Sequence, residues 1–229
     1  YSNTYMPISE FKKCLQQVSH EHIVEIAIAT RPDCINDSYL EVLKEHRTAT
    51  GHNITIELGL QTVNYQTLLK VNRGHTLAEY IDAVIRIKKY GFEVCTHLIL
   101  NLPWDYQTDV IETAKIMSAL NIDSVKLHAL YILNNTVMGN QYNKGEIDMI
   151  SLEEYQERVI TFLEYLDPNI TVQRLLGRAP QGRALFANWD TSWWKVRDDI
   201  EAKMIERGSY QGKRCDYLNG RFVKHLIDD

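Results

Sequence analysis

The chain passes from an apolar run, His22 to Ala29, directly into Thr30-Arg31-Pro32-Asp33-Cys34-Ile35, which opens a helical pattern. The apolar run is nearly continuous, as in a parallel strand that is covered on both faces. Charged residues therefore follow the end of a predicted strand, and this carboxyl edge of a parallel sheet is where α/β folds place their chemistry. Proline fixes its own φ and favours an extended Arg31, so the neighbouring side chains are held in defined directions.

Two further strand ends show the same change from apolar to polar residues. Glu57-Leu58-Gly59-Leu60-Gln61-Thr62 closes a strand that starts at Asn53, and Asn101-Leu102-Pro103-Trp104-Asp105 follows a strand predicted over Phe92–Leu100. Predicted strands start near residues 22, 53, 92, 124 and 171, and helical patterns separate them. This alternation predicts βα units on a parallel sheet, and their number favours a partial or complete barrel over a small open sheet.

Capping boxes mark two of the predicted helix starts, Thr76-Leu77-Ala78-Glu79 and Ser151-Leu152-Glu153-Glu154. From Pro180 the alternation of strands and helices stops, and a long charged helix with tryptophans at its start follows. We therefore expect a barrel domain over residues 1–176 and a C-terminal extension packed on it over residues 177–229.

Composition and charge are those of a globular protein. The 229 residues are 45% hydrophobic and 24% charged, enough to bury one substantial core. No apolar run approaches the roughly 20 residues that span a bilayer, and no signal-peptide pattern opens the chain, so a cytoplasmic protein is expected. The net charge of −5 is uneven, because residues 171–229 carry 11 Lys and Arg against 8 Asp and Glu.

The four cysteines, Cys14, Cys34, Cys95 and Cys215, are separated by 20, 61 and 120 positions. This spacing predicts free thiols packed as small apolar groups and no metal-binding cluster. No metal ligand and no catalytic residue is assigned from the sequence.

Polar residues at the predicted strand ends are candidates for ligand binding. Glu57 and Gln61 suit a ribose, because a carboxylate and an amide together bind a diol well. Arg31 and Asp33 either face a ligand or form an ion pair inside a turn. Arg73, just before a predicted helix, could hold a phosphate or carboxylate with the free backbone N–H groups there, and a glycine-containing turn between helices explains it equally.

Two histidines fall within predicted strands. His97 and His128 are explained either as packed core residues or, on adjacent strands, as ligands of a divalent metal in a barrel hydrolase. No carboxylate near them in sequence completes such a ligand set.

Taken together, six strings in order resemble a branch of the radical SAM superfamily, the one related to the Elongator catalytic subunit. The strings are Tyr1-Ser2-Asn3-Thr4-Tyr5-Met6-Pro7, Thr30-Arg31-Pro32-Asp33-Cys34, Glu57-Leu58-Gly59-Leu60-Gln61-Thr62, Asn72-Arg73-Gly74-His75, Thr96-His97-Leu98-Ile99 and Lys126-Leu127-His128. Arg207-Gly208-Ser209-Tyr210-Gln211-Gly212-Lys213 is similar to the C-terminal signature of that branch. The resemblance covers residues 1 to about 213.

This resemblance implies a partial (β/α)6 TIM-like barrel with a C-terminal helical extension, in which the first βα unit is missing. It also implies a radical SAM enzyme. Such enzymes hold a 4Fe–4S cluster on three cysteines and cleave S-adenosylmethionine reductively to a 5′-deoxyadenosyl radical, which abstracts hydrogen from the substrate. The implied partners are tRNA, modified at the wobble uridine, and an electron donor such as flavodoxin or ferredoxin.

The resemblance also places cofactor-binding residues at successive strand ends. The residues expected to bind S-adenosylmethionine are Asn3, Thr4, Arg31, Asp33, Glu57, Gln61, His97 and Asn101. Asn3 and Thr4, at the end of the barrel's second strand, would lie by the methionine amino group. Glu57 and Gln61 would lie near the ribose, and His97 and Asn101 by the adenine.

The sequence departs from this branch in two places. The three-cysteine motif is missing, and the four cysteines present do not replace it, so the chain as written is expected to be inactive. It is either part of a longer protein or a relative that has lost its cluster, and the retained polar strand ends favour the first. The loop Asn-Leu-Pro-Trp-Asp replaces the usual Gly-Leu-Pro-Gly-Glu, so Trp104 is expected to narrow the pocket and the role of Asn101 is open.

Partners are expected at two surfaces. Basic residues near the C-terminus are the candidate RNA-docking surface: Arg174, Arg178, Arg183, Lys195, Arg197, Lys213 and Arg214. A barrel without its first strand exposes a sheet edge, which predicts a dimer through that edge or a less stable chain. The alternatives are a non-catalytic barrel that binds RNA or another ligand, and the metal-dependent hydrolase.

Overall fold

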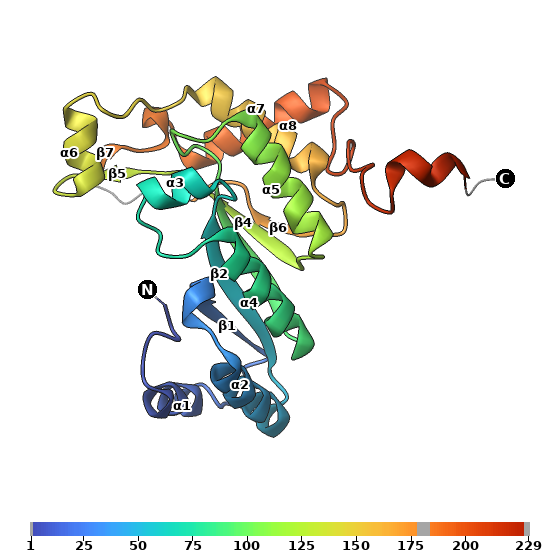
Figure 1. Ribbon diagram of the computed structural model, residues 1–229. Coiled ribbons are helices and arrows are strands. Elements are labelled where there is room, and N and C mark those ends of the chain that lie inside the picture. The colour runs from blue at the N-terminus through green and yellow to red at the C-terminus, as the bar shows by residue number, and fades with distance from the viewer. Residues whose placement is uncertain (1, 178–183, 227–229) are drawn as a thin grey trace. The chain divides into compact units, whose positions relative to one another are not determined.

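The computed structural model describes residues 2–177 and 184–226 (Figure 1). Five strands form one sheet in the order β1-β2-β3-β4-β6, so neighbours in the sheet follow one another along the chain. The strands are β1 (Glu25–Thr30), β2 (Asn53–Gln61), β3 (Glu93–Ile99), β4 (Ser124–His128) and β6 (Thr171–Arg174). β2 pairs in parallel with both β1 and β3. The predicted α/β class with a parallel sheet is confirmed.

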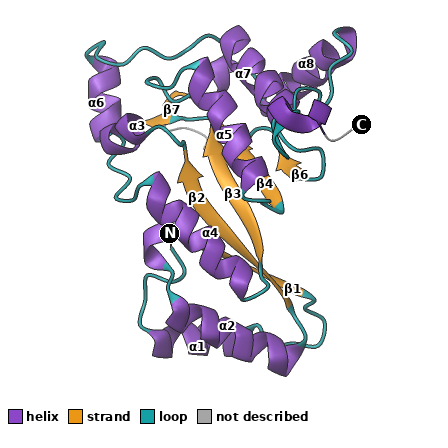
Figure 2. Cartoon of the chain, turned by 45° about the vertical axis from the view of Figure 1, so that its right-hand side comes forward, coloured by secondary structure: helices purple, strands orange, loops and turns teal. Residues whose placement is uncertain are grey.

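The chain divides into two compact units, residues 1–98 with 122–125 and residues 99–121 with 126–229. The helices of the first unit are α1 (Ile8–Gln17), α2 (Asp37–Thr50), α3 (Tyr65–Lys70) and α4 (Leu77–Lys89), with a 3₁₀ turn η1 (Pro32–Cys34). Those of the second are α5 (Gln107–Ala119), α6 (Val137–Asn143), α7 (Leu152–Tyr165) and α8 (Trp193–Glu206), with the 3₁₀ turns η2 (Asn188–Asp190) and η3 (Arg221–Leu226). The second unit also holds an antiparallel pair, β5 (Ile132–Leu133) and β7 (Ala184–Phe186). Figure 2 shows these elements by type.

In the first unit the sheet has one apolar and one polar face. Along β2, Ile54, Ile56 and Leu58 alternate with Thr55, Glu57 and Gly59, and successive side chains of a strand point to opposite faces. The apolar face is covered by α2 and α4. There the buried Tyr80 hydroxyl lies 2.6 Å from the Thr96 hydroxyl of β3. Glu57 lies on the polar face, where the candidate site described below is formed.

The expectation that the first predicted strand is covered by apolar residues on both faces is wrong in detail. β1 begins at Glu25. His22 belongs to an exposed turn, after which the Ile23 N–H donates to the His20 carbonyl, and Val24 is exposed and lies outside the strand. Within β1, Ala27 and Ala29 lie on the polar face of the sheet. They made the sequence pattern of this strand appear apolar on both faces, because alanine has no polar side-chain atom. Small residues on this face leave room above it.

Helix starts follow the sequence signals. Asn36 caps α2 by accepting from the Ser38 N–H at 3.0 Å, and Thr76 forms the predicted capping box of α4. In that box the Thr76 N–H donates to Glu79 Oε2 at 2.6 Å. Ser151 accepts from the Glu154 N–H at 3.1 Å, which starts α7 as expected.

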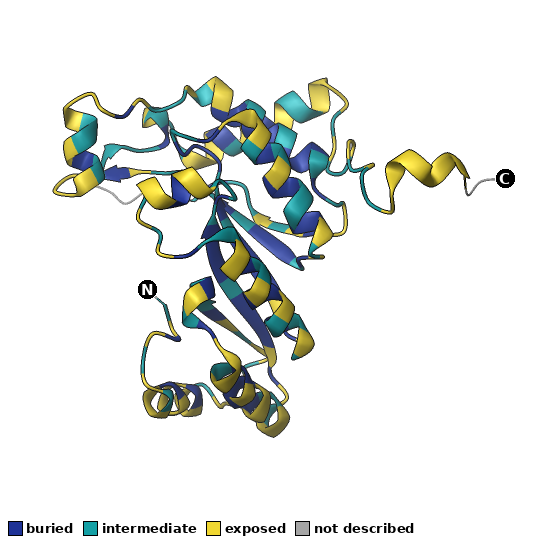
Figure 3. Cartoon of the chain, viewed as in Figure 1, coloured by how far each residue is buried: buried dark blue, intermediate teal, exposed yellow. Residues whose placement is uncertain are grey.

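Figure 3 shows α2 and α4 with exposed outer faces while β2 is buried along most of its length.

Residues 3–6 form a turn and a bend, and no strand precedes Asn3 and Thr4 among the described residues. Asn3 imitates one step of strand pairing: its N–H donates to the Ala29 carbonyl at 2.8 Å, and the Ala29 N–H donates to Asn3 Oδ1 at 2.9 Å. β1 is the end strand of the sheet, and this turn occupies part of its open edge.

In the second unit, α7 packs against both α5 and α8. Arg158 of α7 is buried and holds the segment after β3, because it donates to the carbonyls of Leu100 at 3.1 Å and Asp105 at 2.7 Å. Its guanidinium also pairs with Glu154 at 2.8 Å. Across the part of the chain that the structure describes, no helix is long and apolar enough to cross a membrane.

Candidate functional site

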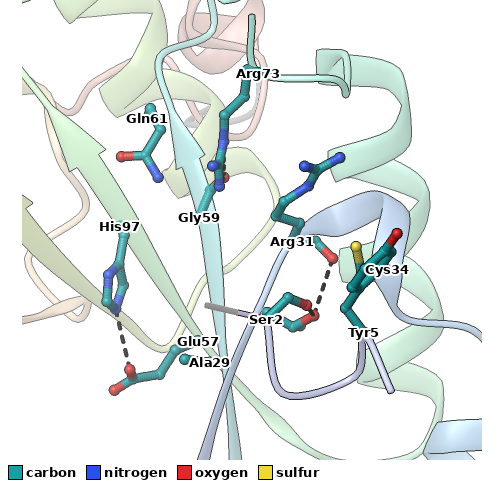
Figure 4. Close-up of a pocket in the computed structure, with 11 residues that line it drawn as sticks. Ser2, Tyr5, Ala29, Arg31, Cys34, Glu57, Gly59, Gln61, Arg73 and His97 are labelled. Carbon is teal, nitrogen blue, oxygen red and sulfur yellow. Dashed lines mark hydrogen bonds and ion pairs between the residues drawn. The ribbon is translucent and has the colours of Figure 1, made fainter. Parts of the chain in front are cut away.

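A cavity of about 530 Å³ opens in the first unit at the carboxyl ends of β1 and β2 (Figure 4). Its polar lining comprises Ser2, Arg31, Glu57, Gln61, Arg73 and His97. These side chains come from the N-terminal turn, from three strands or the segments that follow them, and from the turn between α3 and α4. The cavity therefore lies at the sheet edge that the sequence singled out.

Arg73 reaches the cavity because Gly59 has no side chain. A Cβ at Gly59 would overlap the Arg73 guanidinium and would lie only 2.8 Å from Gln61 Nε2. Arg73 Nη2 donates to the Gly59 carbonyl at 2.6 Å, and its Nε donates to His75 Nε2 at 3.0 Å. Burial, followed by the charge of Arg73, lowers the pKa of His75, so the ring stays neutral and accepts this bond. Arg73 is thus held along one edge of its guanidinium, through Nε and Nη2.

Gln61 reaches the cavity through an irregularity in β2. The pairing of β2 with β3 shifts between Gly59 and Gln61, and Gln61 has a φ of 77°. A β-bulge of this kind re-aims a side chain, and a left-handed conformation is costly for a residue other than glycine. The strain is located at the residue whose amide faces the cavity.

Arg31 is the second guanidinium at the cavity. Its Nε donates to Asp33 Oδ1 at 2.9 Å, and its Nη2 pairs with Asp33 Oδ2. Burial opposes ionisation of Asp33, yet the bonds and charge of Arg31 outweigh it, so the pKa of Asp33 is lowered. Gly74, with a φ of 77°, allows the close approach, because a Cβ there would lie 2.9 Å from Arg31 Nη2.

Two guanidiniums against the single carboxylate of Asp33 leave this part of the cavity with a net positive charge. Burial lowers the pKa of Arg73, and the charge of Arg31 is the next cause, so the two cations act on each other. Both remain protonated at neutral pH, since a guanidinium loses its proton only far above it. An anionic group, above all a carboxylate, suits this position.

Glu57 and His97 form the opposite wall. Glu57 Oε2 lies 3.4 Å from His97 Nε2 (dashed line in Figure 4), and both side chains are mostly buried. Cys95, the register partner of Glu57, joins them, and the ligand atoms of the three residues lie within 4.8 Å of one another. The sequence indicated no carboxylate beside His97, because Glu57 is 40 residues away along the chain and only the strand register brings the two together.

Half of the predicted cofactor-binding residues meet at the cavity. Arg31, Glu57, Gln61 and His97 line it. Asp33 stands behind Arg31 as its partner. Ser2 and Cys34 line it too but were not predicted as site residues. Arg73, which the sequence offered as a holder of a phosphate or carboxylate, lines it as well. For Arg73 the signal was present, in the string Asn72-Arg73-Gly74-His75.

The other predicted residues have partners of their own. Thr4 is 3% exposed, and its hydroxyl donates to the Cys34 carbonyl at 2.6 Å and lies 2.5 Å from the Thr30 hydroxyl. Asn3 bonds to the backbone of Ala29. Asn101 belongs to the second unit, where its Oδ1 accepts from the Leu130 N–H at 2.6 Å. In the structure these three hold turns and strand ends together.

Cys14 is exposed, so the expectation that the thiols are mostly packed as small apolar groups is wrong for it.

His128, the second histidine of the predicted hydrolase, contacts Arg174 in the second unit, with Arg174 Nη2 2.7 Å from its Nε2. The carboxylate and thiol beside His97 come from β2 and β3.

The predicted RNA-docking residues are largely engaged with acidic neighbours. Lys195 pairs with Asp199 at 2.9 Å, Arg197 with Asp198 at 2.7 Å and Arg214 with Glu164 at 2.9 Å. Lys213 donates to the Gly208 carbonyl at 3.0 Å. Arg178 and Arg183 lie outside the described residues. The positive charge of this segment is therefore partly balanced within the second unit.

Comparisons with known proteins agree with this architecture. A family model described as the Radical SAM superfamily matches residues 2–117, and one described as the Radical_SAM C-terminal domain matches residues 122–206. The uncharacterized protein YtqA of Bacillus subtilis is 35% identical over 214 residues, which cover 93% of this chain and 66% of YtqA. The chain thus spans about two thirds of the length of such a relative.

Two further matches bear on fold and on function. The tRNA uridine(34) acetyltransferase of Methanocaldococcus jannaschii is 27% identical over 158 residues, covering 67% of this chain and 28% of that protein. The solved structure of Methanocaldococcus infernus Elp3 with an N-terminal deletion superposes with a TM-score of 0.71 at 20% identity. That likeness covers 89% of this chain and 46% of Elp3, and it confirms the predicted TIM-barrel-like α/β fold.

Proposed function

Because the chain belongs to the radical SAM superfamily, whose members are enzymes, we propose that the cavity beside Gly59 binds S-adenosylmethionine for a radical reaction on tRNA. The observation that carries the proposal is the division of the cavity into a cationic side and a polar side. Arg31 and Arg73 line the first. Glu57, Gln61 and His97 line the second.

The cavity residues fit the cofactor group by group. The methionine carboxylate suits the guanidiniums of Arg31 and Arg73, because both are permanent cations that carry several N–H donors. The ribose diol suits the carboxylate of Glu57 and the amide of Gln61, and His97 is proposed to border the adenine. A volume of about 530 Å³ lies within the range of small-ligand pockets.

For Asn3, Thr4 and Asn101 we propose an indirect role. Asn3 and Thr4 fix the turn that carries Ser2 into the cavity, since they bond to Ala29 and to Thr30. Asn101 fixes the segment after β3 through Leu130. Their direct contact with the cofactor stays a prediction.

The residues of this chain do not fit a 4Fe–4S cluster. A cluster of this class needs three cysteines close together, and Cys14, Cys34, Cys95 and Cys215 are 20 or more positions apart. When bound to such a cluster, S-adenosylmethionine supplies hydrogen-atom abstraction. The part proposed for this chain is to bind and orient the cofactor.

The substrate class rests on the relatives. The match to a tRNA uridine(34) acetyltransferase, 27% identical over 158 residues, supports a tRNA substrate modified at the wobble uridine. Of the proposed docking residues, Lys213 and Arg214 are the best candidates. Among the described residues the Lys213 ammonium donates to a carbonyl and pairs with no carboxylate, and Arg214 is 57% exposed despite its pair with Glu164. A cytoplasmic location and reduction by flavodoxin or ferredoxin belong to the same proposal.

Equilibrium binding of S-adenosylmethionine to the purified chain, followed by calorimetry, tests the proposal. Saturable one-site binding that weakens in Glu57→Gln supports it. Binding of tRNA alone, with none of the cofactor at millimolar concentration, would favour a barrel that binds RNA without catalysis.

A further inference from the structure

A carboxylate, a thiol and an imidazole meet on the polar face of the sheet. Glu57 and Cys95 are register partners on β2 and β3, and His97 follows Cys95 by two residues, so all three side chains emerge from the same face. Their ligand atoms lie within 4.8 Å of one another, and Glu57 Oε2 and His97 Nε2 are 3.4 Å apart. All three residues belong to the first unit.

We propose that Glu57, Cys95 and His97 bind a single divalent cation of the zinc type. Zinc takes oxygen, nitrogen and sulfur ligands at about 2.0–2.3 Å, which places the ligand atoms of a tetrahedral site about 3.5 Å apart. The separation of Glu57 and His97 already matches this value. A thiolate and an imidazole together disfavour magnesium and calcium, which take oxygen ligands.

The surroundings suit an ion that enters from the cavity. Cys95 is completely buried, and its strand is held between β2 and β4. The side chains of Glu57 and His97 are 14% and 22% exposed and line the cavity. The ion would therefore have three protein ligands and an open position toward the cavity, which is the arrangement of catalytic rather than structural zinc sites.

The site shares a residue with the proposed cofactor site. A metal on Glu57 occupies the carboxylate assigned to the ribose diol, so the metal and S-adenosylmethionine are expected to exclude each other. This competition rests on the proposed function, whereas metal binding itself does not.

Cobalt is the probe of choice, because a thiolate bound to Co²⁺ gives a charge-transfer absorption that unbound cobalt lacks. We expect the purified chain to bind one equivalent of Co²⁺ with this absorption and to release it to Zn²⁺. Cys95→Ser removes the absorption. His97→Gln, a change at a partly exposed side chain, weakens binding roughly tenfold or more and tests the site if Cys95→Ser does not fold.

Two matched variants test whether Cys34 or Cys215 provides the thiolate instead. Cys215→Ser, in the second unit, and Cys34→Ser, in the same cavity, both keep the absorption if the assignment is right. Absence of binding, an absorption that survives Cys95→Ser, or its loss in Cys34→Ser would overturn the site.

The competition is read by adding S-adenosylmethionine to the cobalt-loaded chain. Displacement of cobalt supports both proposals. A chain that binds cobalt but whose metal-free form binds no S-adenosylmethionine overturns the proposed function and leaves the metal site. Binding of S-adenosylmethionine by a chain that shows no cobalt–thiolate absorption overturns the metal site and leaves the proposed function. Simultaneous binding of cobalt and S-adenosylmethionine overturns the shared use of Glu57.

Discussion

The guanidinium of Arg73 crosses directly over Gly59 and donates to its carbonyl at 2.6 Å, in space that any side chain at position 59 would occupy. The glycine is part of β2, and Arg73 lies 14 residues later, in the turn before α4. Their contact joins the cationic side of the cavity to the strand that carries Glu57.

Gly59→Ala should displace both Arg73 and Gln61. Overpacking of this kind costs about 1–3 kcal/mol if the neighbours hold their places, and less if the two side chains move aside. We expect stability to fall by no more than this and affinity for S-adenosylmethionine to fall by roughly tenfold or more, measured by urea unfolding and by calorimetry. Gly177→Ala is the matched control, because its new Cβ would meet only ordinary contacts at 3.5 Å or more. Unchanged affinity in Gly59→Ala would contradict the assigned role of Arg73.

Arg73→Met should weaken S-adenosylmethionine binding by roughly 10- to 100-fold. This factor corresponds to about 1.5–3 kcal/mol, the contribution of hydrogen bonds to a charged group. The affinity of Arg73→Lys should lie between those of the parent chain and Arg73→Met, since lysine keeps the positive charge and loses the planar pair of N–H donors. Adenosine, which lacks the methionine carboxylate, provides the test of position, because its affinity should not change. An equal loss for adenosine would mean that Arg73 supports the whole cavity rather than binding the carboxylate.

Acid should destabilise the first unit through His46. This side chain is buried 3.1 Å from His52 Nδ1, and burial, followed by the charge of His52, lowers the pKa of His46. The unfolded chain then binds more protons than the folded one below the ordinary value of 6.5, so stability is complete above about pH 6.5 and falls as the pH drops further. His75 has a lowered pKa and acts in the same direction.

Urea midpoints between pH 7.5 and 5.5 measure this effect. His46→Gln should flatten the dependence on pH, while His22→Gln, at an exposed side chain, should leave it as in the parent chain. An equal slope in the parent and in His46→Gln would assign the effect to other groups.

Thr76→Ala should destabilise the chain by about 1 kcal/mol, because it removes the acceptor of the capping box of α4. Thr48→Ala, at an exposed position inside α2, should be close to neutral. The difference between the two urea unfolding curves isolates the cap. Equal curves would show that the start of α4 is fixed by its packing on β2 instead.

Much of the site could be predicted from the sequence because parallel strands end at a common edge. Arg31, Glu57 and Gln61 each follow an apolar run, and this rule alone brings them together at the cavity. The meeting of Glu57 with Cys95 and His97 depends on the register between β2 and β3, which no local pattern encodes. The pairing of Asn3 with Ala29 was not predicted either, because it runs through the Asn3 side chain, which β-propensity does not describe.

The most direct test of the cofactor site uses Cys34, which lines the cavity, and the exposed Cys14 as an internal reference. Alkylation of both thiols by iodoacetamide is followed by mass spectrometry with and without saturating S-adenosylmethionine. If the cofactor occupies the cavity, Cys34 is protected and Cys14 reacts at an unchanged rate. Equal rates at Cys34 with and without S-adenosylmethionine would contradict the proposed site.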